Sequence, residues 1–226
     1  MRQTNIPERE MQARGPFAPQ FSELPDRLPL FPLGGALLLP GGRLPLNIFE
    51  PRYLAMVRDA IAAPHRLIGM IQPDATKDEL YQIGCAGRVS EFAEQDDGRI
   101  VITLTGLVRF QLLESQELED GYLQGLVSWH DFSADLSQDN SAIDRPHLMR
   151  VLHDYFDAKG YKADWDQLES CEDERLVTSL AMICPFDEAE KQAMLEAPSL
   201  AERAQLLTAI LEMSVHQEFE KGPSTH

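Results

Sequence analysis

The fold of this chain is decided by residues 80–105, LYQIGCAGRVSEFAEQDDGRIVITLT. In the first half, apolar side chains recur at roughly every second position, which is typical of a half-buried β-strand. Asp97-Gly98 predicts a tight hairpin turn, because glycine accepts the positive φ that such turns require. In the second half, alternate apolar side chains again share one face, so a returning antiparallel strand is expected.

Further short apolar runs lie on both sides of this hairpin. Proline punctuates the earlier ones and removes backbone donors, which predicts irregular or edge strands joined by turns. We expect Gly106 to interrupt the returning strand. Several short strands at this spacing predict an antiparallel sheet curled into a barrel. The runs are LPLFPL (28–33), ALLLP (36–40), RLPLNIF (43–49), 67–71, 108–113 and 122–129.

Helical patterns occur once within the barrel region and then dominate the last third of the chain. Glu50-Pro51 predicts a helix start, since proline at a first-turn position loses no hydrogen bond, and Pro64 ends that helix. Later, five apolar residues at spacings of three and four define one helical face, and Gly160 follows as a helix terminator. A second such run ends before Pro185, and two capping boxes predict further helix starts. The residues concerned are Leu148, Val151, Leu152, Tyr155 and Phe156 for the face, Leu176, Val177, Leu180 and Ile183 for the second run, and Asp187 with Glu190 and Ser199 with Glu202 for the boxes.

These patterns predict an α+β protein in which a β-barrel precedes a bundle of α-helices. We expect five segments along the chain. They are a flexible N-terminal arm (1–24), the β-rich barrel (25–132), a polar linker (133–142), the helical bundle (143–218) and a short tail (219–226).

The chain is strongly acidic, because 37 Asp and Glu residues outnumber 20 Lys and Arg residues in 226, for a formal net charge of −17. The barrel region is acidic as well, with 15 acidic against 9 basic side chains. Affinity for nucleic acids and for anionic membranes depends mainly on clustered cations. We therefore expect no nucleic acid and no membrane among the partners.

The cysteines and the hydropathy indicate the compartment. Three scattered cysteines, Cys85, Cys171 and Cys184, are an odd number and do not suit a disulfide framework, so reduced thiols are expected. No apolar run approaches the ~20 residues of a membrane span, and the polar start lacks the apolar core of a signal peptide. We expect a cytoplasmic protein.

No pattern in the sequence indicates a catalytic, cofactor or metal site. There is no Walker A motif, no G-x-S-x-G elbow, no H-E-x-x-H and no C-x-x-C. The acidic clusters, such as 172–174, are explained by turns and by helix starts, where the helix dipole favours negative charge. Cys85 lies in a predicted strand with no histidine nearby to activate it. We predict no catalytic residues, no cofactor and no metal.

Several blocks, taken in order, resemble the N-terminal substrate-binding domain of the Lon proteases. Small bacterial proteins that carry this domain alone are the most similar, and cereblon contains a related domain. FEPRY preceded by L-P-L-x-I is the most specific element. The resemblance covers about residues 28–215, and it rests on LPLFPL (28–33), LLLPGGRLPLNIFEPRY (37–53), IGMIQPD (68–74), IGCAGRVSEF (83–92), GLVRFQL (106–112) and EKQAMLEAPSLAERAQLLTAIL (190–211).

The resemblance implies a PUA-like pseudo-barrel followed by a helical bundle, which agrees with the pattern of strands and helices. In Lon this domain recognises substrates for an attached ATPase domain and protease domain. Neither of these two domains is recognisable in this sequence. The tail KGPST (221–225) echoes the Lon catalytic serine only by coincidence. Within FEPRY we expect Pro51 to start a helix, Phe49 and Tyr53 to act as apolar anchors, and Glu50 and Arg52 to bridge elements, as a fold-defining junction.

Three functions compete at this point. The first is a non-catalytic module that binds proteins or exposed peptide segments, such as a protease or chaperone partner, at a sheet edge or in the groove between barrel and bundle. The second is a small hydrolase or ligand-binding protein that uses the same groove. The third and weakest is RNA binding through the PUA-like barrel, against which the acidic charge argues.

Overall fold

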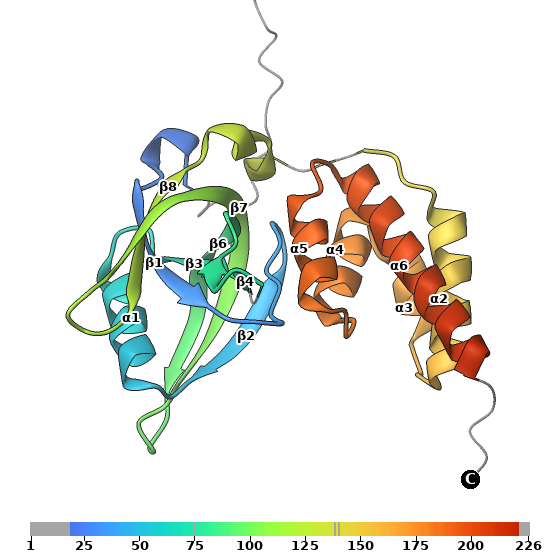
Figure 1. Ribbon diagram of the computed structural model, residues 1–226, viewed down its shortest axis with the longest axis horizontal. Coiled ribbons are helices and arrows are strands. Elements are labelled where there is room, and N and C mark those ends of the chain that lie inside the picture. The colour runs from blue at the N-terminus through green and yellow to red at the C-terminus, as the bar shows by residue number, and fades with distance from the viewer. Residues whose placement is uncertain (1–18, 75, 138, 140, 222–226) are drawn as a thin grey trace, which may run out of the picture.

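The computed structural model describes residues 19–74, 76–137, 139 and 141–221, and it has two lobes that lie side by side (Figure 1). One lobe holds all the strands and one helix, and the other holds the remaining helices, which confirms the predicted α+β fold. The helices are α1 (Pro51–Ala62), α2 (Arg145–Lys159), α3 (Trp165–Ser170), α4 (Asp173–Ile183), α5 (Glu188–Glu196) and α6 (Leu200–Lys221).

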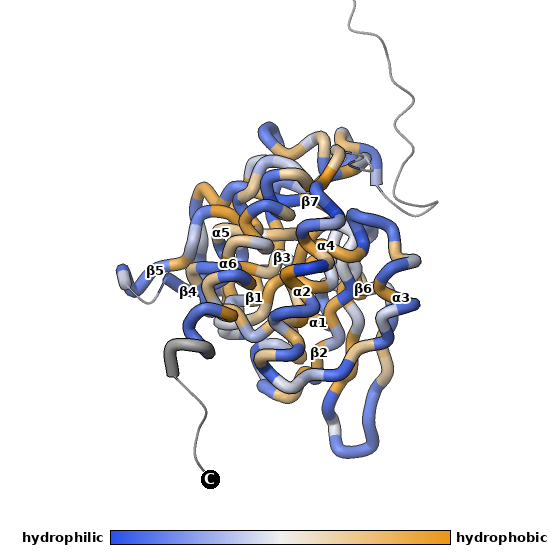
Figure 2. The backbone as a smooth tube through the Cα atoms, turned by 90° about the vertical axis from the view of Figure 1, so that its right-hand side faces the viewer, coloured by the Kyte–Doolittle hydropathy of each residue, from blue (hydrophilic) through white to orange (hydrophobic). Residues whose placement is uncertain are grey.

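The barrel is a six-stranded sheet in the order β2-β7-β6-β3-β1-β8. Its long strand β7 closes the sheet on itself, because the first half pairs with β2 and the second half pairs with β8. All pairings are antiparallel except that of β1 with β3. The strands are β1 (Arg27–Pro32), β2 (Arg43–Ile48), β3 (Leu67–Ile71), β6 (Ile83–Glu94), β7 (Ile100–Glu117) and β8 (Leu123–Ser128). A separate hydrophilic hairpin of β4 (Pro73–Asp74) and β5 (Glu79–Leu80) projects from the molecule (Figure 2).

Two predictions about the barrel are wrong for a common reason. Gly106 does not interrupt β7, and the apolar run at 36–40 is not a strand. That run is a buried loop, with Leu37, Leu38 and Leu39 at most 2% exposed. The loop crosses β7 at the glycine, where a Cβ would lie 2.1 Å from the carbonyl oxygen of Leu39. Gly106 therefore serves a close approach of two backbones rather than a break in the strand.

Helix α1 begins as predicted. Pro51 occupies its first turn, Glu50 is the N-cap residue, and the helix ends two residues before Pro64. Tyr53 is buried and packs on Phe31 with ring centroids 4.3 Å apart, so it is the expected anchor. Phe49 is not an anchor, because its side chain is 64% exposed.

The helical lobe follows its predicted start and stop signals. Gly160 caps α2 in the left-handed conformation, with φ 67°. The capping box of Asp187 and Glu190 forms in both directions at the start of α5. At the start of α6, the Ser199 hydroxyl accepts a hydrogen bond from the Glu202 N–H. Helix α3 was not predicted, because six residues are too few to show a helical period.

The ends of two predicted segments include short 3₁₀ helices. The arm expected over 1–24 includes a 3₁₀ turn, η1 (Phe21–Glu23), and its first 18 residues lie outside the described part of the chain, as do residues 222–226 of the tail. The linker expected over 133–142 begins inside a 3₁₀ helix, η2 (His130–Leu136), whose Asp135 is buried. One hydrophobic core includes residues of both lobes. The division into separate domains stays a prediction.

Candidate binding cleft between barrel and helices

Helix α5 joins the helical lobe to the barrel through buried polar side chains. Lys191 Nζ donates to the carbonyl of Gly35 at 2.5 Å, and Gln192 Nε2 donates to the carbonyl of Ile83 at 3.1 Å. Gln192 also accepts a hydrogen bond from Gln72 Nε2 at 3.1 Å. The Lys-Gln pair of the 190–211 block thus fixes α5 on the barrel.

A second buried contact involves Arg109, which lies in β7 within the 106–112 block. Its Nε and Nη2 donate to the carboxylate of Asp135, each at 2.8 Å. Its Nη1 donates to the carbonyls of Leu195 and Ala197 at 3.1 and 2.8 Å. These carbonyls belong to the end of α5, where no intrahelical partners remain. Arg109 therefore connects the barrel, η2 and α5, and it accounts for a charged residue at a buried strand position.

Arg203 completes this junction from α6. Its Nε donates to the carbonyl of Met194 at 2.9 Å, and its Nη2 donates to that of Ala197 at 3.4 Å. Burial, reinforced by the nearby Arg109 charge, lowers the pKa of Arg203 from its ordinary value. Two guanidinium groups thus share the last carbonyls of α5, which favour positive charge.

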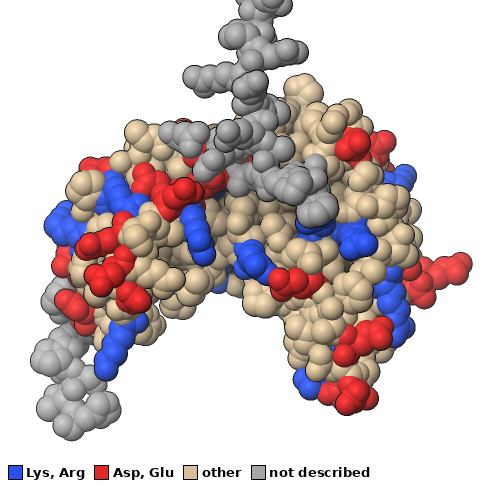
Figure 3. All heavy atoms as spheres, turned by 180° about the vertical axis from the view of Figure 1, so that it is seen from behind, with Lys and Arg blue, Asp and Glu red and all other residues tan. Residues whose placement is uncertain are grey.

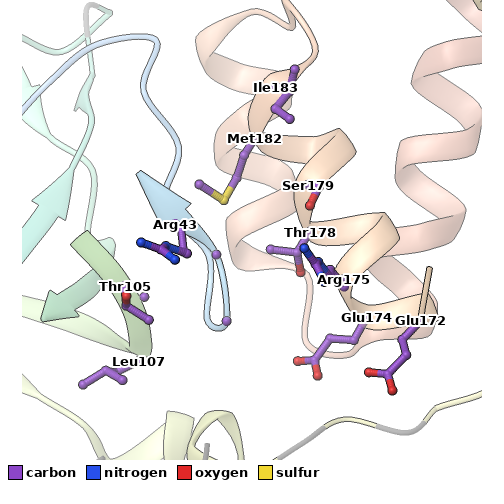
Figure 4. A pocket seen from close by; sticks show the side chains of 13 residues that line it. Arg43, Thr105, Leu107, Glu172, Glu174, Arg175, Thr178, Ser179, Met182 and Ile183 are labelled. Carbon is purple, nitrogen blue, oxygen red and sulfur yellow. The ribbon is translucent and has the colours of Figure 1, made fainter. Parts of the chain in front are cut away.

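Beside this junction, a cleft of about 570 Å³ opens between the barrel and α4 (Figure 4). The barrel contributes the loop before β2 and the middle of β7 around Gly106. The helical lobe contributes residues of α4 from Glu174 to Ile183, together with the N-cap residue Glu172. This is the groove between barrel and bundle that the sequence analysis named as one candidate surface.

Glycines bring the two walls of the cleft together. A Cβ on Gly42 would lie 2.3 Å from Met182 Sδ, so α4 packs directly on the backbone of this loop. The loop is held in turn by β7, because the Gly41 N–H donates to the Gly106 carbonyl and the Gly106 N–H donates to the Gly42 carbonyl, each at 2.9 Å. At these glycines the barrel wall of the cleft is therefore backbone. The N–H groups of the glycines already donate hydrogen bonds to carbonyls of the barrel.

The α4 wall carries one unusual polar atom. Thr178 is 3% exposed, and its hydroxyl has no hydrogen-bond partner among the described residues. A threonine inside a helix commonly bonds back to the carbonyl four residues earlier, and Thr178 does not. Figure 4 shows the side chains of Thr178 and Met182 pointing from α4 toward the barrel. At the end of the helix, Ile183 is 80% exposed at the cleft.

The charges that line the cleft balance, in contrast to the whole chain. Arg43 and Arg175 are the positive residues, and Glu172 and Glu174 are the negative ones. Arg43 also pairs with Glu91 on the barrel at 2.6 Å. Seen from behind, a hollow separates the two lobes, and side chains of both signs lie beside it (Figure 3).

The described residues lack several features of catalytic sites. Burial raises the pKa of the Cys184 thiol to about 11, which keeps it protonated and unreactive at neutral pH. Cys85 is fully buried in β6. His153 stacks on Trp165 with centroids 3.5 Å apart. No group of three His, Cys, Asp or Glu side chains in the described part of the chain could hold a metal ion. The sequence predicted no catalytic, cofactor or metal residues, and that stays a prediction.

No residue of the FEPRY motif (49–53) lines this cleft. Glu50 and Arg52 pair with each other on the surface at 2.9 Å instead of bridging elements, so that expectation is wrong. The guanidinium of Arg52 lies 4.5 Å from the centre of the Tyr53 ring. The motif therefore shapes the strand-to-helix junction through Pro51 and Tyr53.

Residues 27–213 match the ATP-dependent protease La (LON) substrate-binding domain family. The chain belongs to this family. Among curated LON relatives, Lon protease 1 of Bdellovibrio bacteriovorus is 26% identical over 204 residues, which are 86% of this chain and 26% of that protein. The Lon protease of Brevibacillus choshinensis is 26% identical over 198 residues, which are 81% of this chain and 24% of the relative. The chain thus spans about a quarter of the length of these LON proteases.

Solved LON structures have the same fold. The Lon N-terminal domain protein from Xanthomonas campestris has a TM-score of 0.59 at 26% identity, with 81% of this chain and 97% of that chain covered. The N-terminal domain of Mycobacterium avium complex Lon protease has a TM-score of 0.61 at 15% identity, with 82% and 97% covered. The resemblance drawn from the sequence blocks is confirmed. Within the described residues, no helix is both long and apolar enough to span a bilayer.

Local sequence patterns do not identify the residues of the cleft. Ile183 belongs to the apolar run of a predicted helix, and no pattern distinguishes Thr178 or Met182. Arg109 and Asp135 lie 26 positions apart, and no local period links them. Only Gly106 carried a signal, as a glycine inside a strand pattern, which indicates either a break or a close backbone approach.

Proposed function

We propose that this chain is a non-catalytic module that binds polypeptide segments of other proteins. The observation that carries this proposal is membership of the LON substrate-binding domain family, together with an open cleft between the barrel and α4. By analogy with the relatives named Lon protease, we propose that a bound protein is passed to a protease or chaperone partner.

Hydrolysis is the less favoured alternative. A hydrolase needs a nucleophile with an adjacent base, and the cleft is lined by Thr178, Ser179 and Thr105 without a histidine. Arg43 and Arg175 are opposed there by two glutamates, which also disfavours RNA as the ligand. Three free cysteines and the acidic surface agree with a role in the reducing cytoplasm.

Binding of an unfolded protein tests the proposal. Fluorescence anisotropy of a labelled, permanently unfolded protein (reduced and carboxymethylated) should rise on titration with this chain, and the native form of the same protein should not bind. Gel analysis after long incubation should show the unfolded protein intact. A single-stranded RNA oligonucleotide in low salt is the third arm. Binding of RNA but of no protein, or cleavage of the unfolded protein, would overturn the proposal.

A further inference from the structure

The described chain begins near the cleft. Leu24, which follows the short helix η1, is buried in the same hydrophobic cluster as Leu107 of β7, and Leu107 also lines the cleft. The Nε1–H group of Trp129 donates to the carbonyl of Pro25 at 3.0 Å, which fixes this end of the chain on the barrel. The residues before Pro19 are therefore attached to the barrel close to the cleft.

Residues 1–18, MRQTNIPEREMQARGPFA, are numerous enough to reach any part of the cleft from this attachment. A flexible chain of 18 residues spans about 20–25 Å on average, and about 60 Å when it is fully extended. Because such a segment is tethered, its effective concentration at the cleft is on the order of 1 mM. A contact with a dissociation constant of only about 0.1 mM would then be formed most of the time.

This segment differs in charge from the chain as a whole. Its three arginines, Arg2, Arg9 and Arg14, outnumber its two glutamates, so the segment is net positive, whereas the whole chain carries −17. It also contains the large apolar side chains of Met11 and Phe17. A segment of this composition is complementary to a groove that has both acidic and apolar surface.

A second cavity beside the cleft supplies the acidic surface. It has a volume of about 520 Å³, and it adjoins the cleft, because Glu172 and Glu174 line both. Its one guanidinium, that of Arg145, already donates to Asp173 and to the carbonyl of Leu168, so that positive charge is compensated within the protein. We call the cleft and this cavity together the α4 groove. The charged residues that line the second cavity are Asp139, Arg145, Glu169, Glu172, Asp173 and Glu174.

The opposite end of the α4 groove is apolar. Ile183 is 80% exposed there, and Figure 4 shows Glu174 and Ile183 at opposite ends of the α4 wall. These two residues are nine positions apart, which is about 14 Å along a helix axis. Met11 lies three residues before Arg14, about 10 Å in an extended chain, and the long arginine side chain covers the remaining distance. The spacing of cation and apolar group in the segment therefore fits the groove.

We infer that residues 1–18 bind in the α4 groove of their own chain, with Arg9 and Arg14 at its carboxylates and Met11 against Ile183. The segment then competes with the unfolded proteins that the cleft binds. This inference rests on the proposed function and adds an internal competitor to it, so that binding of another protein requires release of the segment.

Charge variants of the full chain test the competition. Arg9→Gln with Arg14→Gln removes the two cations. We expect this pair to bind the labelled unfolded protein about three- to tenfold more tightly than wild type, as for a site that the segment fills about two-thirds to nine-tenths of the time. Arg99→Gln with Arg150→Gln is the matched control, because it changes the net charge equally at two exposed residues that line neither cavity. The control should bind within about twofold of wild type.

Glu172→Gln with Glu174→Gln removes charge from the groove instead of the segment. This pair should also tighten binding of the unfolded protein. Combining it with Arg9→Gln and Arg14→Gln should give no further gain, because both pairs remove the same contact. Gains that add independently would contradict a direct contact between the segment and the groove.

Photo-crosslinking locates the segment without reference to the unfolded protein. Photoreactive benzoylphenylalanine replaces Met11 in the full chain, and mass spectrometry identifies the crosslinked residues after irradiation. We expect crosslinks to α4 or to the loop before β2, within one molecule. An equal mixture of isotope-labelled and unlabelled chains distinguishes these crosslinks from crosslinks between two copies.

Crosslinks that avoid the α4 groove, or that join two copies, would overturn this inference, as would wild-type affinity in Arg9→Gln with Arg14→Gln. The proposed function would stand in each of these cases, because the wild-type chain would still bind the unfolded protein. If neither the wild-type chain nor the arginine variant bound the unfolded protein, the proposed function itself would fail. The crosslinks would then still decide where the segment binds.

Discussion

At the scale of single residues, the most consequential side chain is a buried arginine. Arg109 is 5% exposed, and its donors are shared between the Asp135 carboxylate and two carbonyls at the end of α5. A buried ion pair adds little to stability over a well-packed apolar replacement, but removing one partner leaves a buried charge uncompensated. The contribution of Arg109 to stability is therefore measured by replacing Arg109 while Asp135 is kept.

Arg109→Met is expected to lower the free energy of unfolding by about 3–5 kcal/mol, because the buried Asp135 side chain would lose both hydrogen bonds from the guanidinium. Urea titration followed by circular dichroism measures this. Arg99→Met is the matched control, since Arg99 pairs with Asp97 on the surface, and it should cost at most about 1 kcal/mol. Equal losses in the two variants would contradict the role assigned to Arg109.

Ionisation of Tyr122 is expected to lower the stability of the fold at alkaline pH. Burial, helped by the hydrogen bond from its hydroxyl to Asp59 at 2.7 Å, raises the pKa of Tyr122 to about 12. An unfolded tyrosine has a pKa of about 10, so the folded state holds this proton more tightly. The resulting stability is fully present below pH 10 and is lost as pH rises toward 12.

Tyr122→Phe should therefore unfold in urea with a smaller fall in midpoint between about pH 9 and 11.5 than wild type shows. At neutral pH the same variant should be less stable by about 1–2 kcal/mol, because the charged Asp59 loses a hydrogen bond. Tyr155, whose pKa burial also raises to about 12, keeps part of the alkaline transition. A variant with an unchanged alkaline fall would count against this account.

At the scale of elements, glycines act in two physically different ways. Gly160 ends α2 with φ 67°, and a Cβ there would meet no atom within 4 Å. Gly106 has no such conformation, but a Cβ would lie 2.1 Å from a backbone carbonyl of the crossing loop. One glycine is needed for a turn of the backbone, and the other for the contact between two segments.

Alanine substitutions should separate these two roles. Gly160→Ala is expected to cost about 1 kcal/mol, the strain of a left-handed alanine. Gly106→Ala should cost about 3 kcal/mol or more, because the loop that carries Leu39 must move away from β7. It should also weaken peptide binding, since that loop forms a wall of the cleft. Chemical denaturation of both variants is the measurement, and similar losses would refute the distinction.

At the scale of the whole molecule, the two lobes share a hydrophobic core and the buried junction around α5. Sharing of this kind favours a single cooperative unfolding transition, as expected of small proteins without independent parts. The predicted division into a barrel and a helical bundle would then describe architecture and not separate folding units.

The two tryptophans make this testable, because Trp129 lies beside the barrel core and Trp165 lies in α3. Trp129→Phe and Trp165→Phe each leave one fluorescent reporter, in the helical lobe and in the barrel respectively. In each variant, the urea midpoint followed by the remaining tryptophan should coincide with the midpoint followed by circular dichroism. Separate midpoints within one variant would show that the lobes unfold independently.

Local patterns predicted the elements of this fold and its family. Alternation predicted the β6–β7 hairpin, proline predicted both limits of α1, glycine predicted the end of α2, and a capping box predicted the start of α5, because each of these signals acts within a few residues of the chain. The order of the blocks around FEPRY predicted the LON family.

Only the tertiary structure decided how distant segments meet. It turned the expected break at Gly106 into a backbone crossing, made Asp135 of the expected linker the partner of Arg109, and left Phe49 on the surface. It also brought Thr178 to face the loop before β2 across the cleft. Packing between residues far apart in sequence depends on the closed sheet and the docked helix, and no local period carries that information.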